Sequence, residues 1–158
     1  MIETRKRSVL VTGSGSGIGA ATVRRLAAPD TAILIHALTN RAGCERVAAE
    51  AREKGAETAI MLGDLGDQGF AADLINEVVV QFGGLDVLIA NAGFPDLRVF
   101  GELDRDGLDR CHRVITGGFF QMTDRALPHL KKAQDGRVIA VSTLNAHLFC
   151  NTYPVYPA

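Results

Sequence analysis

The sequence predicts an α/β fold built on a parallel β-sheet with helices on both faces. Short apolar runs alternate along the chain with longer segments whose apolar residues recur at helical spacing. This alternation is typical of right-handed βαβ units, in which strands covered on both faces are apolar throughout. A glycine-rich segment directly follows the first apolar run and precedes the first helical pattern. We therefore expect one doubly wound sheet.

Five segments dominated by Val, Ile, Leu or Ala are the expected strands, as is typical of doubly buried strands. They are Ser8–Thr12, Ala32–His36, Thr58–Leu62, Asp86–Ala90 and Arg137–Val141. Four longer segments between them are the expected helices. They are Gly17–Ala28, Ala42–Lys54, Gln68–Phe82 and Leu108–Lys132. Pro128 is expected to kink or divide the last helix, because proline lacks a backbone N–H.

Length and composition predict a single soluble domain over residues 1–158. The 158 residues are 47% hydrophobic, which is enough for one core. The 17 basic and 18 acidic residues are mixed and give a net charge of −1, so no surface for nucleic acid or an anionic membrane is expected. No apolar stretch has membrane-spanning length, and no targeting segment is expected, so the predicted location is the cytoplasm.

The cysteines and histidines predict neither a disulfide framework nor a metal site. The cysteines are odd in number and far apart, and the histidines lack the i, i+4 spacing of helical metal ligands. They are Cys44, Cys111 and Cys150, and His36, His112, His129 and His147. We expect buried or incidental thiols and structural histidines.

The segment Thr12–Gly19 has the composition of a phosphate-binding turn. Glycines let backbone N–H groups approach a phosphate closely, and the N-terminus of the following helix adds about half a positive charge. A pyrophosphate is the natural ligand of such a turn. Ordinary tight turns between a strand and a helix also use glycine, so the motif alone leaves both interpretations open.

Further polar motifs follow three other expected strands. Asp64-Leu65 follows the third strand, Asn91-Ala92-Gly93 the fourth and Ser142-Thr143 the fifth. A doubly wound sheet binds its ligand outside the carboxyl ends of its strands, where the strand order reverses. We expect these motifs and the glycine-rich segment to converge on one crevice.

With these motifs the chain resembles the short-chain dehydrogenase/reductase family, and most closely its 3-oxoacyl-[acyl-carrier-protein] reductase branch. Thr12-Gly13, Gly17 and Gly19 match the family's phosphate loop, and Asn91-Ala92-Gly93 matches its sheet-end motif. The resemblance implies a Rossmann-type sheet in the order 3-2-1-4-5, whose usual C-terminal part would lie beyond this sequence. It also implies NAD(P)-dependent hydride transfer to or from a small carbonyl or alcohol substrate.

The resemblance assigns cofactor contacts to three of the motifs. Phosphate and ribose contacts are expected from Gly13, Ser14, Ser16, Gly17, Ile18 and Gly19. Asp64 would accept a hydrogen bond from the adenine amino group, beside a backbone contact from Leu65, or else would cap the following helix. Asn91, with Ala92 and Gly93, would tie the central strands together beside the cofactor, although an asparagine in a turn needs no such role.

The end of the second strand bears on the choice between NADP and NAD. NAD-specific relatives place a carboxylate there for the ribose hydroxyls, whereas the segment from His36 to Arg41 contains none. Arg41 is expected to pair with a 2′-phosphate, supported by Thr39 and Asn40. NADP is therefore expected in preference to NAD. The alternative is that Arg41 is a solvated residue at the start of the second helix.

The resemblance also implies the residues that move the proton. Tyr156 lies thirteen residues after Thr143, which is the separation in the family, and Tyr153 does not fit it. We expect Tyr156 as general acid/base and Thr143 as the hydroxyl that holds the substrate oxygen, with Ser142 in its place if the strand is shifted by one. The family's lysine would stand at position 160, beyond Ala158, so the resemblance does not imply activity for these 158 residues alone.

Two departures from the family pattern keep other interpretations open. Aligning Gly118, Phe120 and Pro128 puts Ile115 where a catalytic asparagine usually stands, and isoleucine cannot hold a relay water. The sixth and seventh strands of the family would lie beyond this sequence, so the expected fifth strand would be an apolar edge. Such an edge favours dimerisation or aggregation, and we expect a homo-oligomer. The alternatives to an oxidoreductase are an NADP-binding module without turnover and a shortened product with no function of its own.

Overall fold

Five parallel strands form one sheet in the described part of the chain. The computed structural model describes residues 5–93, 96, 98–99 and 101–144. The strands are β1 (Arg7–Val11), β2 (Thr31–Ala37), β3 (Glu57–Leu62), β4 (Val87–Ala90) and β5 (Arg137–Ala140). They pair in the order β3-β2-β1-β4-β5, and every pairing is parallel. The predicted fold class and strand order are confirmed.

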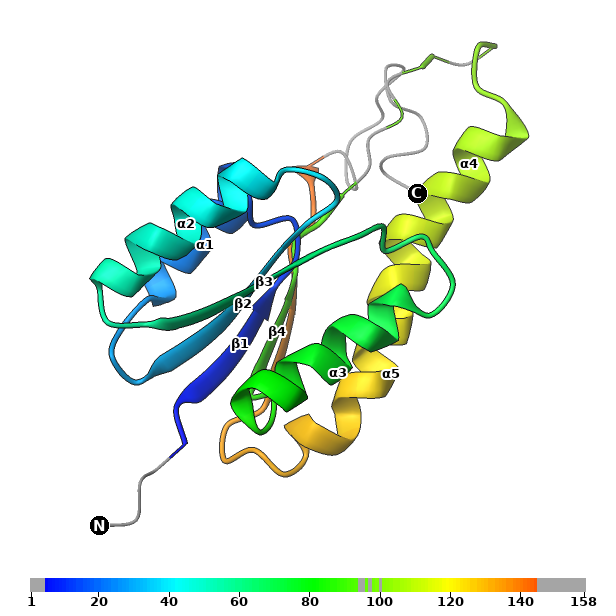
Figure 1. Cartoon of the computed structure of the whole chain (residues 1–158). Helices are drawn as coiled ribbons and strands as arrows, with labels where there is room; N and C mark the ends of the chain where they lie inside the picture. The colour runs from blue at the N-terminus through cyan, green and yellow to red at the C-terminus, as the bar shows by residue number, and fades with distance from the viewer. Residues whose placement is uncertain (1–4, 94–95, 97, 100, 145–158) are drawn as a thin grey trace.

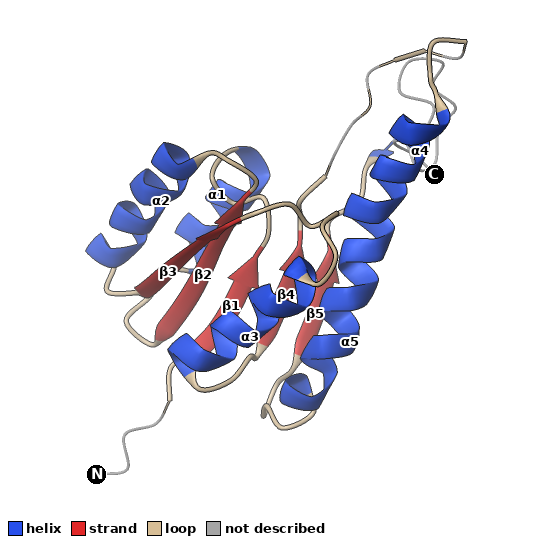
Figure 2. Cartoon of the chain, turned by 45° about the vertical axis from the view of Figure 1, so that its right-hand side comes forward, coloured by secondary structure: helices blue, strands red, loops and turns tan. Residues whose placement is uncertain are grey.

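Helices cover both faces of the sheet (Figures 1 and 2). One face carries α1 (Gly17–Leu26) and α2 (Arg41–Glu53), and the other carries α3 (Phe70–Phe82) and α5 (Gly118–Leu130). Alternate residues of β1 enter the two cores: Val9 and Val11 pack beneath α1 and α2, whereas Leu10 packs against α3 and α5. This alternation follows from the two-residue period of a strand and explains why buried parallel strands are apolar throughout.

The predicted helix over residues 108–132 begins earlier and contains a π-helical turn. It consists of α4 (Arg105–His112), the turn η1 (Arg113–Gly117) and α5, which follow one another without a break (Figure 1). The predicted division at Pro128 is wrong, since α5 continues through it to Leu130. Only two helical residues follow the proline, so its cost falls on a helix end. Among the described residues no helix combines the length and apolar character needed to cross a bilayer.

Candidate functional site

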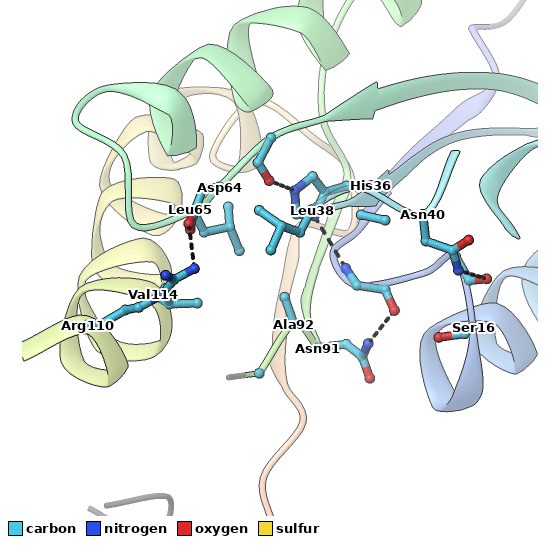
Figure 3. Close-up of a pocket in the computed structure, with 15 residues that line it drawn as sticks. Ser16, His36, Leu38, Asn40, Asp64, Leu65, Asn91, Ala92, Arg110 and Val114 are labelled. Atoms are coloured by element: carbon cyan, nitrogen blue, oxygen red, sulfur yellow. Dashed lines mark hydrogen bonds and ion pairs between the residues drawn. The ribbon is translucent and has the colours of Figure 1, made fainter. Parts of the chain in front are cut away.

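A pocket of about 260 Å³ lies at the carboxyl ends of β1 to β4 (Figure 3). The four segments that leave these strands provide most of its wall, and α4 with its π-helical turn provides the rest. The lining residues are Gly13, Gly15, Ser16, His36, Ala37, Leu38, Asn40, Gly63, Asp64, Leu65, Asn91, Ala92, Gly93, Arg110 and Val114. The predicted convergence is therefore present for the motifs after the first, third and fourth strands, whereas the motif after the fifth strand does not line the pocket.

Glycine is required at several points of the loop between β1 and α1. Gly13 and Gly17 have φ angles of +63° and +55°, which other residues rarely adopt. A Cβ atom on Gly13 would lie 2.9 Å from the Cα of Ala92, and one on Gly19 would lie 2.5 Å from the carbonyl oxygen of Gly13. The glycines thus let the loop pack between the end of β4 and the first turn of α1.

The two serines of this loop have different environments. Ser14 is buried, and its hydroxyl donates to the carbonyl oxygen of Val11 (2.6 Å) and accepts from the backbone N–H of His36 (3.0 Å). Ser16 is exposed, lines the pocket and is the N-cap residue of α1. The side chain of Ser14 therefore joins β1 to β2, whereas Ser16 is available to a ligand.

Three other predicted loop contacts lie outside the pocket wall. Gly17 and Ile18 form the exposed start of α1, where the side chain of Ile18 is 67% exposed. Gly19 is buried, and the groups nearest to it belong to Gly13, Asn91 and Ser14. The structure thus gives Gly19 a packing role beneath the loop.

Asn91 connects the end of β4 to the glycine-rich loop. Its Nδ2 donates to the carbonyl oxygens of Thr12 (2.9 Å) and Gly13 (3.2 Å). The backbone N–H groups of Asn91 and Ala92 both donate to the Thr12 hydroxyl, at 3.0 Å each. The predicted tie between the central strands is present, and it fixes the loop from below.

Asp64 faces the pocket from the end of β3. Its Oδ1 accepts from the backbone N–H of Gly66 (2.8 Å), and its Oδ2 lies 3.2 Å from the guanidinium of Arg110 on α4. The alternative role of Asp64 as the cap of the following helix is wrong, because Gly69 is the N-cap residue of α3. Asp64 instead closes a local turn and keeps a carboxylate at the pocket wall (Figure 3).

Asn40 and Arg41 occupy the start of α2. Asn40 caps the helix, since its Oδ1 accepts from the backbone N–H of Gly43 (3.0 Å), and its Nδ2 donates to the carbonyl oxygen of Gly15 (3.3 Å). Arg41 lies outside the pocket wall, with its exposed guanidinium 3.9 Å from Glu45. Such a surface pair is weak, so this conformation matches the alternative of a solvated arginine.

Several lining residues were not predicted from the sequence. His36, Ala37 and Leu38 belong to the segment compared for cofactor choice, but no contact is predicted for them, and Gly63 directly precedes Asp64. Counting the last strand residues and the first residue after each strand as part of the site would have included them. Arg110 and Val114 come from a helix, so the rule that ligands bind at strand ends gave no signal for them.

An ion-pair cluster fixes the start of α4, which carries Arg110. The buried carboxylate of Asp96 accepts three hydrogen bonds from the Arg98 guanidinium, at 2.9, 3.2 and 2.6 Å. Arg98 also pairs with Asp104, which caps α4 by accepting from the backbone N–H of Gly107 (2.8 Å). Hydrogen bonding to Arg98 lowers the pKa of Asp96 to about 2, so the cluster stays ionised near neutral pH.

The predicted catalytic residues follow β5. Ser142 is exposed and Thr143 half-buried, and neither lines the pocket. Tyr156 and Tyr153 lie outside the described residues. Ile115, at the position of the family's asparagine, is half-buried in the π-helical turn.

The thiols of Cys44 and Cys111 are buried, and burial raises the pKa of both, whereas Cys150 lies outside the described residues. Within the part of the chain that the structure describes, no group of three or more His, Cys, Asp or Glu side chains could hold a metal ion.

Comparisons with known proteins agree with this geometry. The sequence profile of a family described as short chain dehydrogenase matches residues 7–158. The short chain dehydrogenase/reductase AacuN of Aspergillus aculeatus is 34% identical over 140 residues, which are 89% of this chain and 52% of the relative. The chain thus spans about half the length of the curated relatives it matches.

Solved structures show the same arrangement of elements. A short chain dehydrogenase from Burkholderia cenocepacia in complex with NADP superposes with a TM-score of 0.89 at 27% identity, over 96% of this chain and 61% of that one. The NADH-dependent reductase A1-R′ complexed with NAD gives a TM-score of 0.87 at 27% identity, over 97% and 66% of the two chains.

Proposed function

Because the chain belongs to the short-chain dehydrogenase family, we propose that it binds NADP in preference to NAD in the pocket at the strand ends. We further propose that it takes part in hydride transfer between the nicotinamide and the carbonyl or alcohol carbon of a small molecule. The observation that carries the proposal is the meeting of the glycine-rich loop, Asp64 and Asn91 at one pocket. These groups are far apart in the sequence, and the strand order brings them together.

The glycine-rich loop supports the binding of a diphosphate. The pocket wall includes Gly13, Gly15 and Ser16, and α1 begins at Gly17, so its positive dipole end faces the same region. The first turn of α1 contains no acidic residue that would oppose an anion. From Gly13 to Ser16 the loop consists of glycines and serines, whose small size lets a phosphate approach the backbone.

The far end of the pocket supports an adenosine group. Leu38, Leu65 and Val114 provide apolar surface suited to a flat base, and Asp64 places a carboxylate beside them. A carboxylate accepts hydrogen bonds from an exocyclic amino group. We assign the base to this end and the diphosphate to the loop.

The proposed preference for NADP depends on Arg41. Its exposed guanidinium is held by one weak surface pair, so it is able to turn toward a 2′-phosphate beside Asn40. We expect Arg41→Glu to weaken NADPH binding about tenfold or more, with much less effect on NADH, because a hydrogen bond to a charged group contributes about 1.5–3 kcal/mol. Titrations followed by nicotinamide fluorescence measure both dissociation constants and also test whether the chain binds either cofactor.

Arg46→Glu is the matched control, because it makes the same change of charge on the exposed face of α2, outside the pocket wall. We expect it to leave the ratio of the two dissociation constants unchanged. Equal effects of the two substitutions on NADPH would contradict a specific role for Arg41. No saturable binding of either cofactor to folded protein would refute the proposed function itself.

In the proposed chemistry, residues near the end of the given sequence hold the substrate oxygen and transfer the proton. When bound, the nicotinamide supplies or accepts the hydride. Thr143, or Ser142 in its place, holds the substrate oxygen by a hydrogen bond. Tyr156 donates a proton to that oxygen in carbonyl reduction and removes it in alcohol oxidation.

We also propose that the protein is a cytoplasmic homo-oligomer. In the described sheet β5 is an edge strand, and Val138, Ile139 and Val141 are 38%, 46% and 39% exposed. An exposed apolar edge strand is a template for pairing with a second chain. Light scattering of this chain at high concentration is expected to show dimers or larger species, and a monodisperse monomer would contradict association through this edge.

A further inference from the structure

We propose that His36 is a positioning residue that holds the glycine-rich loop and the end of β3 in their cofactor-binding arrangement, and that it does so only as the neutral imidazole. The inference rests on the proposed function for the identity of the ligand. It concerns a residue whose side chain lines the pocket and is 2% exposed.

The imidazole of His36 bridges the two walls of the pocket. Its Nδ1 accepts a hydrogen bond from the backbone N–H of Gly13 (3.3 Å), and its Nε2 lies 3.0 Å from the carbonyl oxygen of Gly63. Figure 3 shows the ring with a dashed line to each neighbour. Gly13 begins the loop assigned to the diphosphate, and Gly63 directly precedes Asp64 and Leu65, which are assigned to the adenine.

The two partners determine the protonation state of the ring. A backbone N–H can only donate, so the Nδ1 that faces Gly13 must carry no hydrogen. A carbonyl oxygen can only accept, so the Nε2 that faces Gly63 must carry one. Both bonds form together only in the neutral tautomer with a hydrogen on Nε2.

The surroundings of His36 also favour the neutral form. Burial lowers the pKa of His36, while the bond to Gly63 and the negative charge of Asp64 act in the opposite direction. The groups recorded beside the ring from the loop and from α3 are uncharged: they are Gly13 and the ring of Phe70, 5.8 Å away. Asp64 is itself paired with Arg110 of α4.

Protonation would break the contact with the glycine-rich loop. A hydrogen on Nδ1 would face the N–H of Gly13, so two donors would meet and the bond would be lost. Gly13 packs against Ala92 and its carbonyl oxygen accepts from Asn91, so movement of its N–H would disturb the adjoining Gly15 and Ser16 at the pocket wall.

The direction of the pH effect follows from the depressed pKa. The neutral ring contributes fully above the ordinary histidine pKa of about 6.5, and its contribution is lost as pH falls through the lower value of the folded protein. Cofactor affinity is therefore expected to fall on acidification.

The test compares the wild type with His36→Asn and His36→Leu in NADPH titrations that start at about pH 8 and descend through the pKa of His36, which NMR of the free protein locates. Asparagine offers an oxygen near the position of Nδ1 and does not titrate, whereas leucine offers no acceptor. At the higher pH we expect His36→Asn to bind within about threefold of the wild type and His36→Leu about tenfold more weakly, the effect of one lost hydrogen bond.

The pH profile distinguishes positioning from packing. We expect the dissociation constant of the wild type to rise on acidification more steeply than that of His36→Asn. Protonation of the phosphate groups of NADPH affects both proteins equally, so it does not contribute to the difference between the two profiles. Parallel profiles, or full affinity of His36→Leu at the higher pH, would overturn the inference. So would tighter wild-type binding at the lower pH, since the imidazolium would then be a phosphate ligand.

A second readout does not depend on the cofactor. Nitrogen NMR of the imidazole in the free protein is expected to show the tautomer with a hydrogen on Nε2, and the Gly13 amide shift is expected to follow the titration of His36. The opposite tautomer, or a Gly13 amide indifferent to that titration, would overturn the inference even if NADPH binds. If NADPH binds to no variant, the proposed function fails, and these spectra decide the role of His36 in holding the loop.

Discussion

Replacing Gly19 by alanine is expected to raise the dissociation constant for NADPH at least about a hundredfold and to lower the free energy of unfolding by about 2–4 kcal/mol. A Cβ atom at this position would lie 2.5 Å from the carbonyl oxygen of Gly13, 2.6 Å from Nδ2 of Asn91 and 2.8 Å from the Cα of Ser14. None of these groups moves freely, because two are backbone and the third ties β4 to β1. The substitution must therefore displace the loop from the end of β4.

Gly69→Ala is the matched control for this prediction. Gly69 has a φ of +86° with open space around its Cβ position, and it lies outside the pocket wall. Alanine there should cost about 1–2 kcal/mol of backbone strain and leave NADPH affinity unchanged. Thermal unfolding and fluorescence titration measure both quantities. NADPH binding by Gly19→Ala within threefold of the wild type would contradict the role given to the loop.

Replacing Tyr156 by phenylalanine is expected to lower kcat for carbonyl reduction by about 10²–10⁴ while the dissociation constant for NADPH stays unchanged. The phenol is proposed to give its proton to the substrate oxygen as the hydride reaches the carbon, and phenylalanine has no proton to give. The measurement is steady-state NADPH oxidation over a panel of small ketones, alongside direct cofactor titration of the same protein.

Tyr153→Phe is the control for the catalytic prediction, because it removes the same hydroxyl from a tyrosine that does not fit the family separation from Thr143. We expect its kcat to stay within threefold of the wild type. Retention of more than a tenth of the activity by Tyr156→Phe would contradict the assignment. A wild-type chain that binds NADPH but reduces no carbonyl would instead contradict the proposed reaction and leave a binding module.

Most of the fold could be predicted because the buried strands have an apolar composition that can be read from the sequence. Val9, Leu10 and Val11 are apolar without interruption since neighbouring residues enter opposite cores, and most residues of β2 and β4 do the same. β3 is half-buried and β5 is exposed, so their apolar residues do not report burial in two cores. The helix around Pro128 was harder, because the effect of a proline depends on how many helical residues follow it. The π-helical turn at Arg113–Gly117 has no local composition that marks it.

The site was predicted only where its residues directly follow strands. Gly13, Asp64 and Asn91 meet there because the carboxyl ends of parallel strands share one edge of the sheet. Arg110 reaches the pocket from α4, whose start is set by a cluster around Arg98 that periodicity does not reveal.

The sequence also does not distinguish the roles of two serines that have the same flanking residues. Ser14 and Ser16 both stand between glycines, yet one is buried between β1 and β2 and the other is exposed at the pocket. The difference arises from the register of β1 against β2, where the backbone of His36 binds the Ser14 hydroxyl.

The most direct measurement is a two-dimensional amide NMR titration of the folded chain with NADPH. We predict saturable shifts in two groups of amides: Gly15 and Ser16 at the loop, and Asp64 and Leu65 at the end of β3. These groups border the two ends of one pocket, and both should saturate at the same cofactor concentration. Shifts confined to other parts of the sheet, or none that saturate, would contradict the claim that a dinucleotide lies across these strand ends.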